Sequence, residues 1–415
     1  MDVTSLADRG YEYSVDLLKK LIEIPSVSPS GENYDKISDL LYKELSRIAD
    51  SVEVIEVPKS YQSRNCKSAG ENPRYIVLGR VKGLSGKRIH FNGHYDVVPG
   101  GQGWTVTDPF KPVIKDGRLY GRGAIDMKGG IAAVMGAVYA VHESGSQPYH
   151  DIELAFVPDE EIGGECGTGY LVEEVLAGNL PDYVIIPEPS GLNYPWHGHK
   201  GLLWAKVKVK GANAHGSTPW RGKNAFLLGA RLSLELLSAY TPILSRKRSK
   251  YKTIPEESMH PTIMIGGEAG VTGGGKTNQV PGEFYFTIDR RLIPEETVDE
   301  VKKEFEAVLR WVGHGLGLDY TVEYTAMMEP AINEPGELYR ALVKAASIHG
   351  VSVNEPIVCP GGLDLRYYTS RGVKTLSYGP GGEVAHAPDE YISLDELKKL
   401  VGIFYTMVSD KTVWA

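Results

Sequence analysis

Two kinds of hydrophobic periodicity divide this chain of 415 residues. Between residues 75 and 186, short strand-like runs alternate with an apolar, small-residue helix pattern at 129–143. Alternating strands and helices are typical of a layered α/β sheet. From residue 202, LLWAKVKVK instead alternates apolar residues with lysine, as a half-exposed strand of an antiparallel sheet does. The length allows two domains, because one hydrophobic core rarely grows this large.

The second pattern has the order of a ferredoxin-like domain, strand–helix–strand–strand–helix–strand. Its expected elements are 202–210, 225–240, 262–266, 283–288, 296–312 and 319–325. Helix and strand patterns of the first kind then return at 336–348 and 374–378. We therefore predict an α/β domain made of residues 1–196 and 327–415, interrupted by an inserted domain at 197–326.

Charge and composition narrow the class of protein. The net charge of −8 argues against a nucleic-acid surface, which is normally basic. No apolar run has the length of a membrane span, and the first residues lack the pattern of a signal peptide. The cysteines Cys66, Cys166 and Cys359 are far apart and form no CxxC pair. We therefore expect neither a disulfide nor a thiolate zinc site, and a cytoplasmic location.

Residue types that bind metals follow several of the apolar runs or lie in short Gly/Pro-rich segments. They are His94, Asp126, Glu160, Glu161, Glu188 and His386. Oxygen and imidazole ligands at strand ends are how α/β enzymes assemble hydrolytic metal centres. The set predicts a metallohydrolase.

Several of these residues also have a simpler interpretation, and Glu188 taken alone would more often be an ordinary loop residue. His94, in HFNGHYDVVP, could be an ordinary histidine near a turn, although Asp96, two residues on, can hydrogen-bond its far nitrogen. Asp126, in GRGAIDMKGG, could cap a helix or use both oxygens to bridge two metals. The adjacent Glu160 and Glu161 could be a solvated loop, or one could bind metal while the other transfers protons.

The motifs HFNGHYDVVP, GRGAIDMKGG, PDEEIGG, IIPEPS and AHAPDEYI together resemble a known family. It is the di-zinc metallopeptidase family of acetylornithine deacetylase, succinyl-diaminopimelate desuccinylase, aminoacylase and glutamate carboxypeptidase. The resemblance covers nearly the whole chain. It implies a zinc-exopeptidase-like catalytic domain, an inserted lid and dimerisation domain, and a homodimer.

The same resemblance implies a division of roles. His94 and Glu188 would hold one metal, Glu161 and His386 the other, and Asp126 would bridge them. Glu160 would be the unligated general acid/base, and the peptide after Asp126 would be cis. The metals implied are two divalent ions, zinc first, with cobalt or manganese as alternatives.

Three segments resemble the family's substrate-binding parts. GANAHGSTPWRGKNA implies that His215 polarises the scissile carbonyl in the partner subunit's site, although it could be a turn histidine. TNQVPGEFYFTIDRR implies substrate-binding roles for Asn278 and Arg291, since the planar guanidinium fork suits a carboxylate. PGGLDLRYYTSRG implies a loop that faces the substrate, with Gly362 in it and Gly361, Asp364 and Arg366 as further lining.

The expected reaction is hydrolysis of an amide. A hydroxide bridging two metals about 3.5 Å apart would attack the carbonyl, with Glu160 as general base. The substrate would be an N-acyl amino acid or diamino acid carrying an acetyl or succinyl group. The alternatives are a metallo-exopeptidase, carboxypeptidase or dipeptidase, that uses the same centre on a short peptide, and a non-catalytic, metal-stabilised binding protein.

Overall fold

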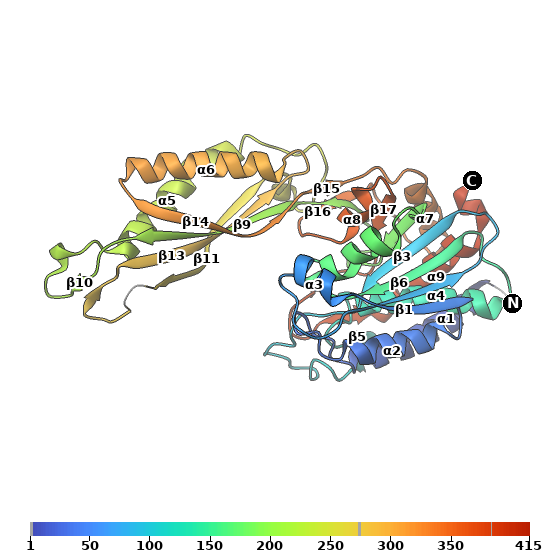
Figure 1. The fold of residues 1–415 in the computed structure, drawn as a ribbon. Coiled ribbons are helices and arrows are strands. Elements are labelled where there is room, and N and C mark those ends of the chain that lie inside the picture. The colour runs from blue at the N-terminus through green and yellow to red at the C-terminus, as the bar shows by residue number, and fades with distance from the viewer. Residues whose placement is uncertain (1–2, 273–274, 383) are drawn as a thin grey trace. The chain divides into compact units, whose positions relative to one another are not determined.

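The computed structural model describes residues 3–272, 275–382 and 384–415. The chain divides into two compact units (Figure 1). Unit 1 consists of Met1–His197, Asn333–Pro356 and Leu363–Ala415, and unit 2 of Gly198–Ile332 and Ile357–Gly362. The chain therefore enters unit 2 from unit 1 and returns to it, and each unit is described below by itself.

Unit 1 is built on a mixed sheet with the strand order β1-β2-β6-β3-β7-β17. Its strands are β1 (Ser51–Glu56), β2 (Tyr75–Val81), β3 (Arg88–His94), β6 (Asp151–Val157), β7 (Tyr183–Ile186) and β17 (Lys374–Ser377). The strands β6, β3, β7 and β17 run parallel to one another, whereas β2 pairs antiparallel with both β1 and β6. The short strand β8 (Trp196–His199) pairs with β17, with β15 (Ala331–Ile332) and with β16 (Ile357–Cys359).

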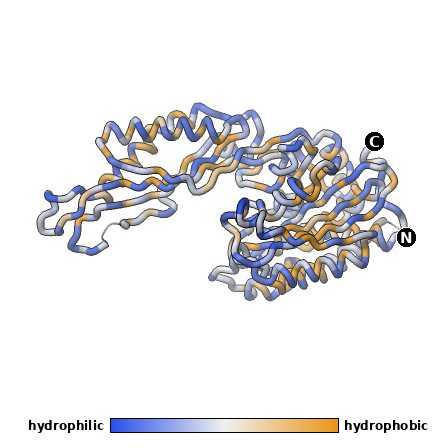
Figure 2. The backbone as a smooth tube through the Cα atoms, in the orientation of Figure 1, coloured by the Kyte–Doolittle hydropathy of each residue, from blue (hydrophilic) through white to orange (hydrophobic). Residues whose placement is uncertain are grey.

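Helices cover this sheet because its strands are apolar on both faces (Figure 2). Two of them, α1 (Val3–Ile22) and α9 (Leu394–Ser409), pack on α4 (Lys128–Ser144), whose small apolar residues are buried almost all round. A fourth helix, α7 (Glu337–Ile348), packs on α9. A further helix, α2 (Tyr34–Leu45), packs on β1 and β2. The α/β architecture predicted from the sequence is confirmed.

Smaller elements of unit 1 shape the ends of these strands and helices. They are α3 (Lys59–Asn65), α8 (Leu365–Thr369), and the three-stranded sheet of β4 (Val113–Lys115), β5 (Arg118–Tyr120) and β18 (Tyr391–Ser393). In that sheet β5 pairs antiparallel with both β4 and β18.

Unit 2 has an antiparallel sheet with the order β11-β13-β9-β14. The strands are β9 (Gly201–Lys210), β11 (Thr262–Val271), β13 (Glu283–Leu292) and β14 (Asp319–Met328). The helices α5 (Ala225–Leu244) and α6 (Val298–Gly315) pack on each other and on the sheet. Alternate residues of β13 are buried, as expected when helices cover one face only. The order of elements and strands confirms the ferredoxin-like fold.

One prediction about unit 1 is wrong, because Cys66 and Cys166 form a disulfide. The two residues are 100 positions apart, and sequence spacing does not reveal that the end of α3 meets the segment that follows Glu160 and Glu161. The third cysteine, Cys359, is a buried thiol. The expectation of a cytoplasmic location therefore stays a prediction without support from the cysteines.

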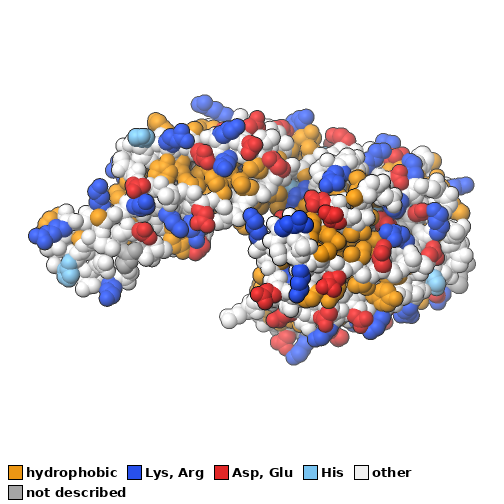
Figure 3. All heavy atoms as spheres, viewed as in Figure 1, with side chains coloured by type: hydrophobic (Ala, Val, Ile, Leu, Met, Phe, Trp, Pro, Cys, Tyr) orange, Lys and Arg blue, Asp and Glu red, His pale blue; other side chains and the backbone are white. Residues whose placement is uncertain are grey.

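The surface of the described residues mixes charges of both signs. Lysine and arginine side chains are interspersed with aspartate and glutamate over the visible face of each unit (Figure 3). Across the described ranges, the helices include none whose length and apolarity would let it span a bilayer.

Candidate metal centre

Three parallel strands bring metal-binding residue types to one edge of the unit 1 sheet. His94 is the last residue of β3, Glu160 and Glu161 follow β6, and Glu188 follows β7. Because β3 lies between β6 and β7 and runs parallel to both, the carboxyl ends of the three strands meet. This is the edge at which open α/β sheets bind their ligands.

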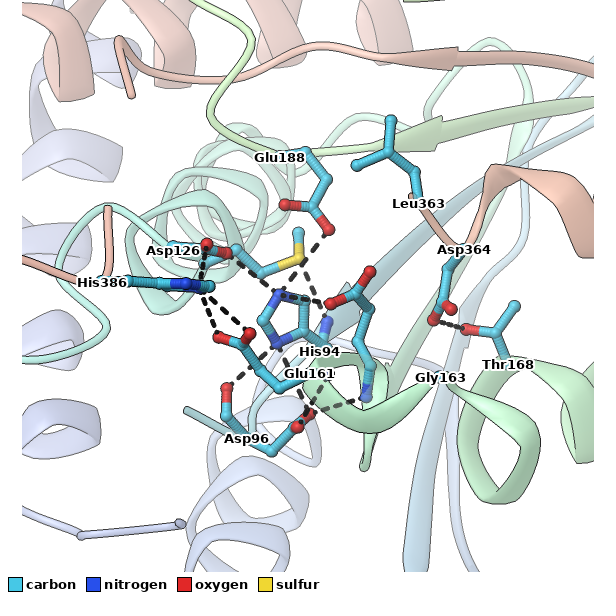
Figure 4. A network of polar contacts seen from close by, with 12 residues as sticks. His94, Asp96, Asp126, Glu161, Gly163, Thr168, Glu188, Leu363, Asp364 and His386 are labelled. Atoms are coloured by element: carbon cyan, nitrogen blue, oxygen red, sulfur yellow. Dashed lines mark hydrogen bonds and ion pairs between the residues drawn. The ribbon is translucent and has the colours of Figure 1, made fainter. Parts of the chain in front are cut away.

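Two other segments complete the group (Figure 4). Asp126 precedes α4, and its peptide bond to Met127 is cis, as the family resemblance implied. His386 lies in the loop between β17 and β18, with a left-handed backbone at φ 63°. Together the six residues form two trios, His94–Glu160–Glu188 and Asp126–Glu161–His386, in which potential ligand atoms lie within 4.8 Å of one another.

Asp126 connects the two trios. Its Oδ1 lies 3.1 Å from Nε2 of His94, and its Oδ2 lies 3.2 Å from Nε2 of His386. One carboxylate thus presents a different oxygen to each imidazole, which is the arrangement of a ligand shared by two cations. The same His386 nitrogen lies 3.0 Å from Oε2 of Glu161.

The first trio is more deeply buried than the second. His94 Nε2 lies 3.6 Å from Oε1 of Glu188 and 4.0 Å from Oε2 of Glu160. His94 and Glu188 are almost completely buried, while the side chain of His386 is 51% exposed. The second trio therefore borders solvent.

Asp96 holds residues of both trios in place through hydrogen bonds. Its Oδ1 and Oδ2 accept hydrogen bonds from the main-chain amides of Glu160 and Glu161, at 3.2 and 3.3 Å. Nδ1 of His94 lies 3.0 Å from the main-chain carbonyl of Asp96 and 3.4 Å from its carboxylate. The expected contact between His94 and Asp96 exists, but the shorter distance is to the main-chain carbonyl of Asp96. The carboxylate of Asp96 instead accepts the hydrogen bonds of the two amides.

The charges of the site fit a pair of divalent cations. The two trios hold four carboxylates and only two imidazoles, and Asp96 adds a fifth carboxylate beside them. Oε1 of the buried Glu188 has no hydrogen-bond donor within the described part of the chain. Burial, followed by the charge of Glu188, raises the pKa of Glu160. Contacts with Asp126 and Glu161 raise the pKa of His386 to about 10. Buried anions in such excess are unfavourable unless cations compensate them.

Asp364 and Arg366 support the turn that follows Glu161. Oδ2 of the buried Asp364 accepts a hydrogen bond of 2.5 Å from Thr168, and Arg366 donates to the carbonyls of Gly163 and Leu363. At Gly164 a Cβ atom would lie 2.2 Å from Oδ1 of Asp364, so this close approach requires glycine. These side chains brace the site loop from inside unit 1.

His215, predicted as a catalytic residue, and Asn278, predicted to bind substrate, are neighbours at one end of unit 2. His215, in β10 (Ala214–His215), is exposed, and its Nδ1 lies 2.7 Å from Oγ of Ser217. Asn278 is also exposed, and its carbonyl accepts a hydrogen bond from the amide of Gly216. Pairing of β10 with β12 (Gln279–Val280) holds the two residues side by side.

The remaining predicted residues of unit 2 lie on or near its sheet. Arg291, on β13, is partly buried, contacts Asp289 at 2.8 Å and lies over the ring of Trp204. Its neighbour Arg290 is fully buried against Glu296, so its guanidinium is not available to a ligand. Gly362 packs against Met328, where a Cβ atom would meet the sulfur at 2.8 Å.

The sequence interpretation missed Arg122 and Glu390, a buried ion pair inside two of the motifs already quoted. Oε1 of Glu390 accepts a hydrogen bond from the amide of Asp126, and Nη2 of Arg122 donates to the carbonyl of His386. The available signal was their presence in GRGAIDMKGG and AHAPDEYI, where no role had been assigned to them.

This chain is similar to known proteins both in sequence and in fold. Residues 90–410 match the sequence profile of peptidase family M20/M25/M40. A succinyl-diaminopimelate desuccinylase of Polynucleobacter necessarius is 30% identical over 405 residues, covering 94% of this chain and 97% of the relative. An uncharacterised metallohydrolase of Methanocaldococcus jannaschii is 28% identical, covering 96% of this chain and 99% of the relative.

Solved structures show the same fold at lower sequence identity. An M20 family metallo-carboxypeptidase from Sulfolobus solfataricus superposes with a TM-score of 0.73 at 21% identity, covering 95% of this chain and 98% of that one. A di-peptidase from Saccharomyces cerevisiae gives 0.74 at 18% identity, with 98% of each chain covered. With the profile spanning most of its length and a 30% identical relative matched almost end to end, this chain belongs to peptidase family M20/M25/M40.

Proposed function

We propose that this M20 hydrolase is a metal-dependent amidohydrolase that removes an acyl group, acetyl or succinyl, from an N-acyl amino acid or diamino acid. The observation that carries the proposal is the carboxylate of Asp126, whose two oxygens face His94 and His386 at 3.1 and 3.2 Å. The full-length similarity to a succinyl-diaminopimelate desuccinylase supports the choice of an acylated amino acid over other amides.

In this proposal each residue of the two trios has its own task. His94 and Glu188 would hold one cation, Glu161 and His386 the other, and Asp126 both. Two divalent ions, zinc or in its place cobalt or manganese, would supply Lewis acidity and lower the pKa of water in the site. Glu160 remains for proton transfer: Asp96 fixes its main chain, and its carboxylate is the farther of the two near His94. It takes the proton of the attacking water and returns it to the departing amine.

Residues of unit 2 would recognise the rest of the substrate. The planar fork of Arg291 suits a substrate carboxylate, and a ligand there would compete with its present partner Asp289. Asn278, His215 and Gly362 would complete the binding surface, with His215 donating to the oxygen that gains charge in the transition state.

A second copy of this chain would place His215 in the neighbouring site. The exposed face of α5 supports a homodimer, because it carries large apolar side chains that a monomer would leave in water. They are Phe226, Leu227, Leu234 and Leu237, with exposed fractions of 48%, 61%, 69% and 39%.

A hydrolysis panel tests the proposal. The full-length protein, loaded separately with zinc, cobalt or manganese, would be offered acetylornithine, succinyl-diaminopimelate, simple N-acyl amino acids and dipeptides. We expect an N-acyl amino acid to give the highest kcat/KM. Faster cleavage of dipeptides would instead make the protein an exopeptidase, and no turnover with any metal would make it a non-catalytic binding protein.

A further inference from the structure

A buried ion pair joins the two segments that carry Asp126 and His386. Nη1 of Arg122 donates to Oε2 of Glu390 at 2.5 Å, and the two side chains are 3% and 0% exposed. Neither residue is in the group of potential metal ligands. A charged pair so deeply buried is costly to remove from water, so its hydrogen-bond partners indicate what it does.

Glu390 holds the main chain at Asp126. Its Oε1 accepts hydrogen bonds from the amides of Ile125 and Asp126, at 3.0 and 3.2 Å. Because Glu390 precedes β18 directly, and β18 pairs with β5, its place beside the Asp126 turn is fixed by strand register. The carboxylate of Glu390 thus accepts hydrogen bonds from the main chain at Asp126, as the carboxylate of Asp96 does from the main chain at Glu160 and Glu161.

Arg122 holds the main chain at His386. Its Nη2 donates to the carbonyl of His386 at 3.2 Å and to that of Gly100 at 3.3 Å, while Nη1 also reaches the carbonyl of Ala387 at 3.4 Å. His386 has a left-handed backbone, which a residue other than glycine adopts only when its surroundings impose it. The guanidinium supplies such a constraint in a loop whose described residues form no helix or strand.

The geometry points to Arg122 and Glu390 as a positioning pair that fixes His386 against Asp126 and so builds the more exposed of the two cation sites. This inference rests on the proposed function, because it assumes that the trio Asp126–Glu161–His386 holds a cation. Residues that orient ligands from behind typically change metal affinity 10- to 100-fold when they are replaced.

The test is a titration of the metal-free, full-length protein with Co²⁺. Binding is monitored by calorimetry and by the visible absorption of the bound cobalt. Arg122→Lys keeps a positive charge beside Glu390 but loses the fork that reaches His386. We expect it to bind one Co²⁺ with a dissociation constant within about 3-fold of wild type and the other 10- to 100-fold more weakly. Glu390→Gln, which keeps the shape of the side chain, should weaken the same ion most and the other less, because the Asp126 that it orients faces both His386 and His94.

Glu153→Gln is the matched control, since Glu153 is a buried, ion-paired carboxylate that does not contact the six ligand residues. It should lose thermal stability yet bind both ions as wild type does. Equal weakening of both ions in Arg122→Lys, or no weakening in either variant, would overturn the inference. A wild-type protein that fails to bind two ions would instead refute the proposed function, so the two failures are distinguishable.

Discussion

Nε2 of His386 lies 3.2 Å from Oδ2 of Asp126, although a long stretch of chain and several elements separate the two residues in sequence. The contact crosses from the turn before α4 to the loop before β18. The opposite oxygen of Asp126 faces His94. The metal affinity of both trios therefore depends on how well bound cations balance the charge of this single carboxylate.

Removal of metal should destabilise unit 1, because the buried carboxylates then lose their counter-charges. Chelator-treated protein is expected to unfold at a lower temperature, and Zn²⁺ at 100 times its dissociation constant should return about 2.7 kcal/mol per site. Differential scanning calorimetry with and without metal measures this difference. Asp126→Asn should abolish most of the response, and an unfolding temperature indifferent to metal would contradict the assignment of the trios.

Glu160→Gln should keep its metals and lose nearly all turnover. The amide preserves the shape of the side chain but cannot accept the proton of water, and general-base catalysis typically contributes 10²- to 10⁴-fold. Metal content by atomic emission and kcat on the best substrate are the two measurements. A variant that retains more than a tenth of the wild-type rate, with metals bound, would show that Glu160 is not the base.

His215→Ala and Glu160→Ala should each be inactive and should complement each other. If His215 acts in the partner's site, mixing the two variants and allowing subunit exchange creates a heterodimer with one intact site. Activity should therefore rise well above that of either variant alone, with exchange verified by mass spectrometry. Verified exchange without recovery would mean that His215 serves its own chain or has a structural role.

Glu153→Gln should lower stability at neutral pH but not in acid. Burial opposes ionisation of Glu153, but the contacts with His90, Arg88 and Arg80 lower its pKa from 4.5 to about 2. Because the folded pKa is below the unfolded one, the stabilisation is present above pH 4.5 and is lost between pH 4.5 and about 2. It amounts to about 3 kcal/mol at pH 7. Urea unfolding at several pH values should show wild type and variant converging as the pH falls; a constant difference would contradict this account.

Local pattern was enough to predict the elements that position the site. Strand-like runs ending before His94, Glu160 and Glu188 predicted where the carboxyl edge of the sheet would lie, and the change of periodicity at residue 202 predicted unit 2. These features depend on neighbours in sequence, which is why a single chain reveals them. The roles of the six residues came instead from the order of motifs, because a strand end alone does not separate a ligand from a loop acid.

Features that depend on contacts between distant segments were not predictable in this way. The pairing of Cys66 with Cys166 and the hydrogen bonds of Glu390 to the Asp126 turn arise only when β5, β18 and the end of α3 take their places. The helix α9 was also not predicted, because its run from Leu400 to Val408 is buried on every side and lacks the alternating faces by which a single sequence reveals a helix.

The disulfide also closes a covalent ring around the segment that carries four of the six candidate ligands. It closes a ring from Cys66 to Cys166 that contains His94, Asp126, Glu160 and Glu161, while Glu188 and His386 lie outside it. A protease cut at the exposed Lys115 would therefore leave both halves of the ring attached to each other until a thiol reductant separated them. The ligands supplied by β3 and β6 would stay tethered in a nicked chain, so cleavage and loss of the metal centre need not coincide.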